Sequence, residues 1–224
     1  MLLGIETAAG LVGVALADAD GPLGGVWLRG ERRHAETLAP AVAHVLAQAG
    51  ASLADVDVVA VDVGPGLFTG LRVGVATAQG LAAGLGVGVL EVTSVDVLAG
   101  EAYHAGWEGP VAAVVDARRG EVFAALAAGP GGAVEAPSRH TPDALAATLR
   151  RTPRTLLVGT GAHRYAEVFR AAGLRVAGIR EPSPRVLVAL AAGRLAGGET
   201  PVPPAAVRPV YLREADARIN WVQR

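Results

Sequence analysis

The stretch that decides the fold is residues 56–72, VDVVAVDVGPGLFTGLR. Residues 56–63 are rich in β-branched side chains, and their near-continuous apolar character predicts a buried central strand. This strand runs directly into the turn Gly64-Pro65-Gly66. From Phe68 to about Leu85 the apolar spacing then predicts a helix. The unit is a strand, a glycine-rich turn and a helix.

The flanking sequence extends this unit into a larger order of elements. Short apolar segments separated by Ala-Gly and Asp-Gly-Pro turns predict three successive strands, and helical spacing followed by Gly50 predicts a helix before the central strand. A further strand and a helix opening at Thr93/Ser94 come after it. The expected order is βββαβαβα, with strands at 2–7, 11–17, 23–29, 56–63 and 87–92 and helices at 34–49, 68–85 and 95–104.

From Gly109-Pro110 onward the order of elements partly repeats. The same reading predicts strands at 111–116, 121–127, near 133–135 and at 155–159, and helices at 142–150, 162–172 and 185–196. Pro201, Pro203 and Pro204 then indicate a linker before a tail. The two parts of the sequence are similar in the order of their predicted elements, not in their residues.

Two consecutive βββαβα units indicate an α/β protein made of two ribonuclease-H-like halves, the ground plan of the actin and Hsp70-ATPase superfamily. Each half is expected to hold a mixed sheet flanked by helices. The predicted division places the first half, with the interface helices, at residues 1–106, and a degenerate second half with the C-terminal tail at residues 107–224. Fold alone does not define function, which must come from sites.

Composition excludes several classes of chemistry. With no cysteine, the chain lacks thiol nucleophiles, disulfides and thiolate metal sites. All 20 basic residues are arginine, so a Walker-A or Schiff-base lysine is excluded, and a net charge of −1 gives no broad field for nucleic acid. No signal peptide is indicated, and glycines interrupt the uncharged segment 73–90. The sequence predicts a cytoplasmic protein without membrane association.

Two turns could face a nucleotide if the superfamily's phosphate chemistry persisted. Glu6 and Thr7 follow the first strand, and Asp116 with Arg118 opens the second half. Bulky arginines stand where close approach to phosphates favours small residues. An autonomous actin-like ATPase or small-molecule kinase using Glu6, Thr7 and Asp116 around magnesium is therefore the second hypothesis. The Gly64–Gly70 loop could present N–H groups to an anion, but a structural strand-to-helix turn is the favoured interpretation, because no lysine or magnesium-binding hydroxyl pattern accompanies the loop.

Metal and hydrolase chemistry find little support. No two of the five histidines are spaced i, i+4, so no helix carries a pair of metal ligands, and His34 near a helix start is expected to be a surface or capping residue. No Gly-x-Ser-x-Gly elbow is present. These absences count against a peptidase.

Small residues recur every fourth position in the predicted helix 68–85. Gly66, Gly70, Gly74 and Ala78 line one ridge along which another helix could approach closely. Because each helical glycine costs about 1 kcal/mol relative to alanine, tight packing must compensate. We expect this helix and helix 34–49 to form a subunit interface. Packing within the same subunit is the alternative that the sequence leaves open.

Several separated motifs resemble one family, TsaB (YeaZ). The first strand is similar to its Ile-Asp-Thr-Ala start, and residues 64–72 resemble its hallmark Gly-Pro-Gly-Ser-Phe-Thr-Gly-Leu-Arg. His34, Leu38 and Pro40 resemble its His-x-x-x-Leu-x-Pro motif. Residues 116–122 and 209–213 resemble its Asp-Ala-Arg-x-x-Glu-Val and Pro-x-Tyr-Leu-Arg segments. Glu6 and Leu67 depart from the family's Asp and Ser, which weakens the case for nucleotide chemistry.

The resemblance implies a non-catalytic subunit, a degenerate paralogue of the TsaD transferase that forms N6-threonylcarbamoyladenosine in tRNAs reading ANN codons. It implies a heterodimer with TsaD, a ternary complex with TsaE, a homodimer when alone, and only indirect contact with tRNA. ATP and metal would belong to the partner subunits, with no cofactor bound by this chain alone. The interface is expected at Leu38, Val42, Phe68, Gly70, Arg72, Gly74 and Ala78.

Overall fold

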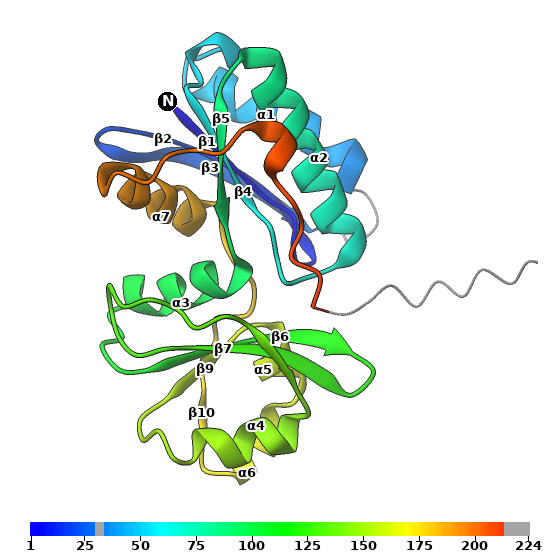
Figure 1. The fold of residues 1–224 in the computed structure, drawn as a ribbon, viewed down its shortest axis with the longest axis vertical. Coiled ribbons are helices and arrows are strands. Elements are labelled where there is room, and N and C mark those ends of the chain that lie inside the picture. Colours follow the sequence, from blue (N-terminus) through cyan, green and yellow to red (C-terminus); the bar gives the residue numbers. More distant parts are fainter. Residues whose placement is uncertain (30–33, 213–224) are drawn as a thin grey trace, which may run out of the picture.

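The computed structural model describes residues 1–29 and 34–212. Two five-stranded sheets form two halves that follow each other along the long axis of the molecule, as Figure 1 shows. Within the described residues, no helix has the length and apolar character needed to cross a membrane.

The first sheet has the strand order β3-β2-β1-β4-β5. Its strands β1, β2 and β3 form an antiparallel meander, β4 lies parallel to β1, and β5 lies parallel to β4. This is the ribonuclease-H-like arrangement predicted from the sequence. The strands are β1 (Leu2–Glu6), β2 (Leu11–Asp18), β3 (Gly21–Arg29), β4 (Val58–Asp62) and β5 (Gly88–Val92).

The second sheet repeats this connectivity in the order β10-β9-β6-β7-β8. Again three strands form an antiparallel meander, and two further strands add in parallel. The prediction of two related halves with mixed sheets is therefore confirmed. The strands are β6 (Val111–Arg118), β7 (Glu121–Ala127), β8 (Ser138–His140), β9 (Leu156–Val158) and β10 (Arg175–Val176).

Two sequence predictions in the second half were wrong in detail, and one strand was missed. The strand expected near 133–135 is only an isolated bridge between Val134 and Ala127, and the third strand is β8. The helix expected at 162–172 is two short helices, α5 (Thr160–Arg164) and α6 (Ala166–Ala171). The short strand β10 was not predicted at all.

Helix ends follow local signals in the sequence. Helix α2 (Phe68–Leu85) stops at Gly86, whose φ of 72° is left-handed and favours glycine. Helix α3 (Ser94–His104) begins at the Thr93 cap, and α4 (Pro142–Leu149) and α7 (Pro184–Ala196) each place proline in the first turn after a Thr or Ser cap. The remaining helices are α1 (His34–Gln48), η1 (Leu53–Asp55) and η2 (Pro204–Ala206).

Each half of the chain contributes one helix that packs on the sheet of the other half. Helices α1 and α2 pack on one face of the first sheet, whereas α7, far away in sequence, packs on the opposite face. Helix α3 contributes Val95, Leu98 and Ala102 to the core of the second sheet, and it lies between the halves in Figure 1. Helices α4, α5 and α6 cover the other face of that sheet. The division at residues 106 and 107 stays a prediction, since each half lends one helix to the other.

The last described segment returns to the first half. Val202 bridges β5 at Val89, Gln79 of α2 donates to the carbonyls of Pro204 and Val207, and the backbone N–H of Val210 donates to Val63. Figure 1 shows this segment running along α2. The segment predicted to be a proline linker therefore packs against the first half and is not a free spacer.

Candidate docking face and central cleft

The ridge of small residues in α2 is buried within the chain. A Cβ atom at Gly70 would lie 2.0 Å from the carbonyl oxygen of Thr7, and one at Gly66 would lie 2.2 Å from the carbonyl oxygen of Ala8. Gly74 faces the Thr7 hydroxyl, and Ala78 has no exposed surface. The ridge therefore lets α2 approach the turn after β1. It packs inside the subunit, which was the alternative left open.

This packing corrects the predicted interface. Leu38 of α1, like Gly70, Gly74 and Ala78 of α2, is buried against the first sheet or its following turn, so these four residues are not a surface for a partner. Val42 of α1 is also largely buried, but it lines the groove described below. Phe68 and Arg72 are exposed, as an interface residue must be. The predicted residues lie on the two helices of the exposed face described below, but four of the seven lie on the inner side of those helices.

The outer side of α1 and α2 is unusually poor in charge. Over 34–48 and 68–85 only Glu36 and Arg72 are Asp, Glu, Lys or Arg. A surface helix normally carries charged residues opposite its apolar stripe. Here alanines and glycines take those positions. We define the docking face as the exposed small residues Ala39, Ala43 and Ala47 of α1 and Ala76, Gly80 and Gly84 of α2.

A shallow apolar groove of about 390 Å³ lies at the edge of this face. Ala39, Ala43 and Ala47 line one side of the groove, and Leu81 of α2 with Leu53 of η1 lines the other. Leu53 is 39% exposed. Because small side chains allow close backbone approach, the face is suited to a helix from another protein.

Two motifs from opposite ends of the sequence meet at the start of α2. The Arg72 guanidinium stacks over the Phe68 ring with its central carbon 3.8 Å from the ring centroid, and Arg72 Nε donates to the Tyr211 hydroxyl at 3.2 Å. The Phe68 and Tyr211 rings lie 5.2 Å apart. Phe68 and Arg72 from the motif at 64–72 and Tyr211 from the motif at 209–213 thus form one exposed cluster; Arg213 lies outside the described residues.

A cleft of about 320 Å³ separates the two halves. The backbone of Pro65 to Leu67 and the turn after β1 line its upper side, and Asp116, Arg118 and Arg164 line its lower side. This is where both candidate nucleotide turns converge. The structure therefore brings the two turns to one cavity, but the Glu6 and Asp116 carboxylates already bind other groups of the protein.

The first carboxylate points away from the cleft. Glu6 ends β1 and Asp62 ends the neighbouring parallel strand β4, so adjacent register places the two carboxyl groups together. Both residues are fully buried. Glu6 Oε1 accepts from the Ala8 N–H, and Asp62 Oδ1 accepts from the Gly64 N–H and the Ser94 hydroxyl. Neither residue lines the cavity.

The surroundings of this carboxyl pair favour a single proton between the two groups. Burial raises the pKa of Glu6 well above its ordinary value, and the neighbouring Asp62 charge raises it further. Burial also raises the pKa of Asp62, although hydrogen bonds from Glu6, Gly64 and Ser94 oppose that shift. The remaining oxygens, Glu6 Oε2 and Asp62 Oδ2, are buried with no other partner. A protonated Glu6 donating to an ionised Asp62 satisfies both, since two adjacent buried charges would repel.

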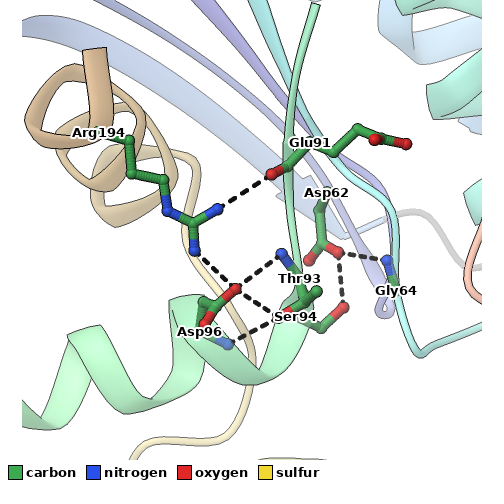
Figure 2. Close-up of polar contacts among 7 residues, drawn as sticks. All are labelled: Asp62, Gly64, Glu91, Thr93, Ser94, Asp96 and Arg194. Carbon is green, nitrogen blue, oxygen red and sulfur yellow. Dashed lines mark hydrogen bonds and ion pairs between the residues drawn. The ribbon is translucent and has the colours of Figure 1, made fainter. Parts of the chain in front are cut away.

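The same corner fixes helix α3 (Figure 2). Asp62 holds Ser94 at the start of the helix, while Asp96 accepts from the Thr93 hydroxyl at 2.6 Å and pairs with Arg194 of α7 at 2.8 Å. Arg194 also donates to the Glu91 carbonyl. These contacts tie β4, β5, α3 and α7 into one unit beside the cleft.

The second carboxylate is covered by cations. Asp116 Oδ2 lies 3.3 Å from Arg164 Nη1 and 3.6 Å from Arg118 Nη1, and Oδ1 accepts from the Arg118 N–H. The Thr7 hydroxyl, in turn, is buried and donates to the Gly70 carbonyl. Glu6, Thr7 and Asp116 therefore offer no converging oxygens to a magnesium ion. This geometry weighs against the ATPase or kinase hypothesis.

His34 differs from its predicted surface or capping role. Its side chain is buried, and Nε2 lies 3.3 Å from the Ala9 carbonyl oxygen, so it anchors α1 to the turn after β1. Within 1–29 and 34–212, no group of three His, Cys, Asp or Glu side chains could hold a metal ion. Reasoning from the sequence missed Asp62, although an acid at the end of each of two neighbouring strands was a signal that could have found it.

The fold and the cleft together define a class of protein. It is a chain of two ribonuclease-H-like halves in which Glu6 does not line the cleft and Asp116 is paired with arginines. The family described as TsaD, tRNA N6-adenosine threonylcarbamoyltransferase, matches residues 23–221. The chain is 35% identical over 187 residues to an uncharacterised protein of Mycobacterium tuberculosis, covering 84% of this chain and 78% of that protein.

Named relatives narrow the class. The tRNA threonylcarbamoyladenosine biosynthesis protein TsaB of Escherichia coli is 36% identical over 122 residues, 54% of this chain and 52% of the relative. The crystal structure of YeaZ from Pseudomonas aeruginosa has a TM-score of 0.80 at 30% identity, covering 94% of this chain and 99% of that one. The chain belongs to the TsaB (YeaZ) family, within the wider TsaD family.

Proposed function

We propose that this chain is a non-catalytic subunit required for forming N6-threonylcarbamoyladenosine in tRNA, and that it acts by docking onto the TsaD transferase. The single observation that carries the proposal is the docking face, a pair of exposed helices nearly without charge. The name of the E. coli relative supplies the pathway. Glu6 accepts a hydrogen bond from the Ala8 N–H, and Asp116 is paired with Arg164. These contacts support a role for the chain in which it performs no nucleotide chemistry itself.

The partner is expected to share this fold, since the TsaD family matches most of the chain. Two related first halves could then pack helix against helix, with small residues at the contact. TsaE joins that pair in a ternary complex, ATP and metal are bound by the partner subunits, and tRNA is contacted indirectly. Without TsaD, the same face pairs two copies of this chain. The assembly works in the cytoplasm.

A bulky residue on the docking face tests this proposal. Gly80 lies in α2 with open space around its Cβ position, so Gly80→Arg leaves the fold intact but places a long cation in the contact. Gly193→Arg is the matched control, because Gly193 is an exposed helical glycine with equally open space on α7. We expect Gly80→Arg to weaken binding to TsaD at least about 100-fold, the loss expected for a buried unpaired charge.

Isothermal titration against TsaD from the same organism measures the effect. Gly193→Arg should bind like the unmodified chain. Equal affinity for Gly80→Arg and the unmodified chain would show that the docking face is not the contact. Absence of any TsaD binding by the unmodified chain would reject the proposed partner.

A further inference from the structure

The cleft between the halves has the features of a ligand site that the docking function does not use. Its volume of about 320 Å³ lies within the range of small-molecule sites, and apolar side chains form part of a wall that is otherwise polar. Pro65 and Leu67 contribute from the first half, Leu98 from α3, Val115 from β6, and Pro182 from the segment between β10 and α7. These surfaces suit the apolar body of a small ligand.

Cationic side chains gather on one side of this cavity. Arg118, Arg164 and Arg180 all line it. Arg118 is the last residue of β6, Arg164 is the last residue of α5, and Arg180 lies between β10 and α7. Arg118 and Arg164 each make one ion pair to Asp116, yet their side chains remain 58% and 51% exposed. A guanidinium carries five N–H donors, so most donors of both residues are available. Arg180 is exposed and forms no ion pair with a described residue.

One further observation points toward a ligand. His163 lines the cavity, and its Nε2 atom is buried without a hydrogen-bond partner among the described residues. An unsatisfied buried nitrogen costs free energy unless something binds it. Arg118 and Arg119, with φ of 63° and 52°, form the tight turn between β6 and β7. This turn places the Arg118 guanidinium beside Asp116 at the cavity.

The positions of the carboxylates in and near the cleft determine which kind of anion the cleft can bind. Glu6 is turned toward Asp62, and Asp116 is held by two arginines, so a metal-bridged phosphate chain has no carboxylate to receive its metal. Guanidinium groups bind phosphate and carboxylate oxygens directly. Glu181, at the same cavity, limits the net positive charge and disfavours a highly charged polyanion.

The geometry points to a metal-free site in this cleft for a small organic oxyanion, a phosphate monoester or carboxylate with an apolar body. The oxyanion contacts Arg118, Arg164 and Arg180, His163 supplies one further hydrogen bond, and the apolar body lies against Leu67, Leu98 and Val115. This site is separate from the docking face, which lies on the outer side of α1 and α2.

Calorimetric titration of the full chain with phenyl phosphate, in a buffer containing EDTA, tests the site. We expect saturable 1:1 binding that is weakened about tenfold in Arg180→Ala, the loss expected for a charge-assisted hydrogen bond. Arg180 makes no structural ion pair with a described residue, so this variant should fold normally. Arg151→Ala, an exposed arginine outside the cavity, is the control and should bind like the unmodified chain. Benzoate replaces phenyl phosphate in a second arm, and binding of either anion supports the site.

Four results would overturn the inference. These are no saturable binding of either anion, equal affinity in Arg180→Ala, binding only when magnesium replaces EDTA, and inorganic phosphate binding as tightly as phenyl phosphate. Unfractionated tRNA is titrated as a further arm. Binding of tRNA alone through Arg180 would mean that the arginines form an RNA-contacting surface instead of a small-molecule site. None of these outcomes depends on whether TsaD binds the docking face.

Discussion

Glu6 and Asp62 are the two residues whose chemistry departs most from that of ordinary side chains. The pKa of Glu6 is raised, so the folded chain keeps the shared proton to a higher pH than the unfolded chain does. The stability from this protonation is fully present below the ordinary pKa near 4.5 and is lost as pH rises through the raised value. Alkaline conditions should therefore weaken the fold at this corner.

Glu6→Gln should remove much of this pH dependence. The amide can accept from the Ala8 N–H and donate to Asp62 without titrating, as the protonated acid does. We expect the free energy of unfolding of the variant to fall less than that of the unmodified chain between pH 5 and pH 9, as measured by urea denaturation. Asp20→Asn, an exposed acid-to-amide change, is the control. An unchanged pH slope in Glu6→Gln would show that the pair does not share a proton.

Glycines 70 and 80 of α2 should respond oppositely to alanine. A methyl group at Gly70 meets the Thr7 carbonyl at 2.0 Å, so Gly70→Ala should lower the free energy of unfolding by about 1–3 kcal/mol. Gly80 has open space, so Gly80→Ala should raise it by about 0.5–1 kcal/mol through helix propensity. Chemical denaturation of both variants decides this. Equal effects would contradict the assignment of inner and outer sides to α2.

Which side of a helix is buried could not be read from the residue pattern. Small residues occur every fourth position on two sides of α2, at Gly66 to Ala78 and at Ala76 to Gly84, and spacing alone does not distinguish them. The distinction comes from the turn after β1, whose backbone needs close approach. That contact links Thr7 with Gly70 across 63 positions and is invisible to local reasoning.

Among the elements, the start of α3 should be the most sensitive to a single change. Asp96 caps the helix through Thr93 and pairs with Arg194, with both side chains partly buried. Asp96→Ala should lower the free energy of unfolding by about 1–3 kcal/mol, since it removes a cap and leaves Arg194 without its carboxylate. Guanidinium denaturation measures the loss. A change below about 0.5 kcal/mol would mean that α3 and α7 are held by apolar packing alone.

Most elements could be predicted from the sequence because their signals are local. The start and end of α2 were predicted at Phe68 and Leu85, as the structure has them, since a glycine turn precedes the helix and Gly86 ends it. The third strand of the second half was misplaced because residues 133–140 contain little apolar alternation, and β8 is paired only through β7. Short elements defined by a neighbour leave weak local signals.

At the scale of the whole molecule, the repeated connectivity was predictable but the exchange of helices was not. Element order alone implied two βββαβα units, and the sheets show the same strand order twice. The exchange of α3 and α7 between the halves depends on contacts far apart in sequence, such as the pair Asp96 and Arg194. This exchange joins the two halves, and α3 contributes Ser94 and Leu98 to the wall of the cleft.

The yield of N6-threonylcarbamoyladenosine in a reconstituted reaction tests the central claim most directly. The reaction contains TsaD, TsaE, tRNA, the threonylcarbamoyl donor and this chain, and nucleoside mass spectrometry quantifies the product. We predict a yield with Gly80→Arg that is at least tenfold lower than with the unmodified chain or with Gly193→Arg, and no product from this chain alone. A full yield with Gly80→Arg, or product formed by this chain without TsaD, would contradict the account.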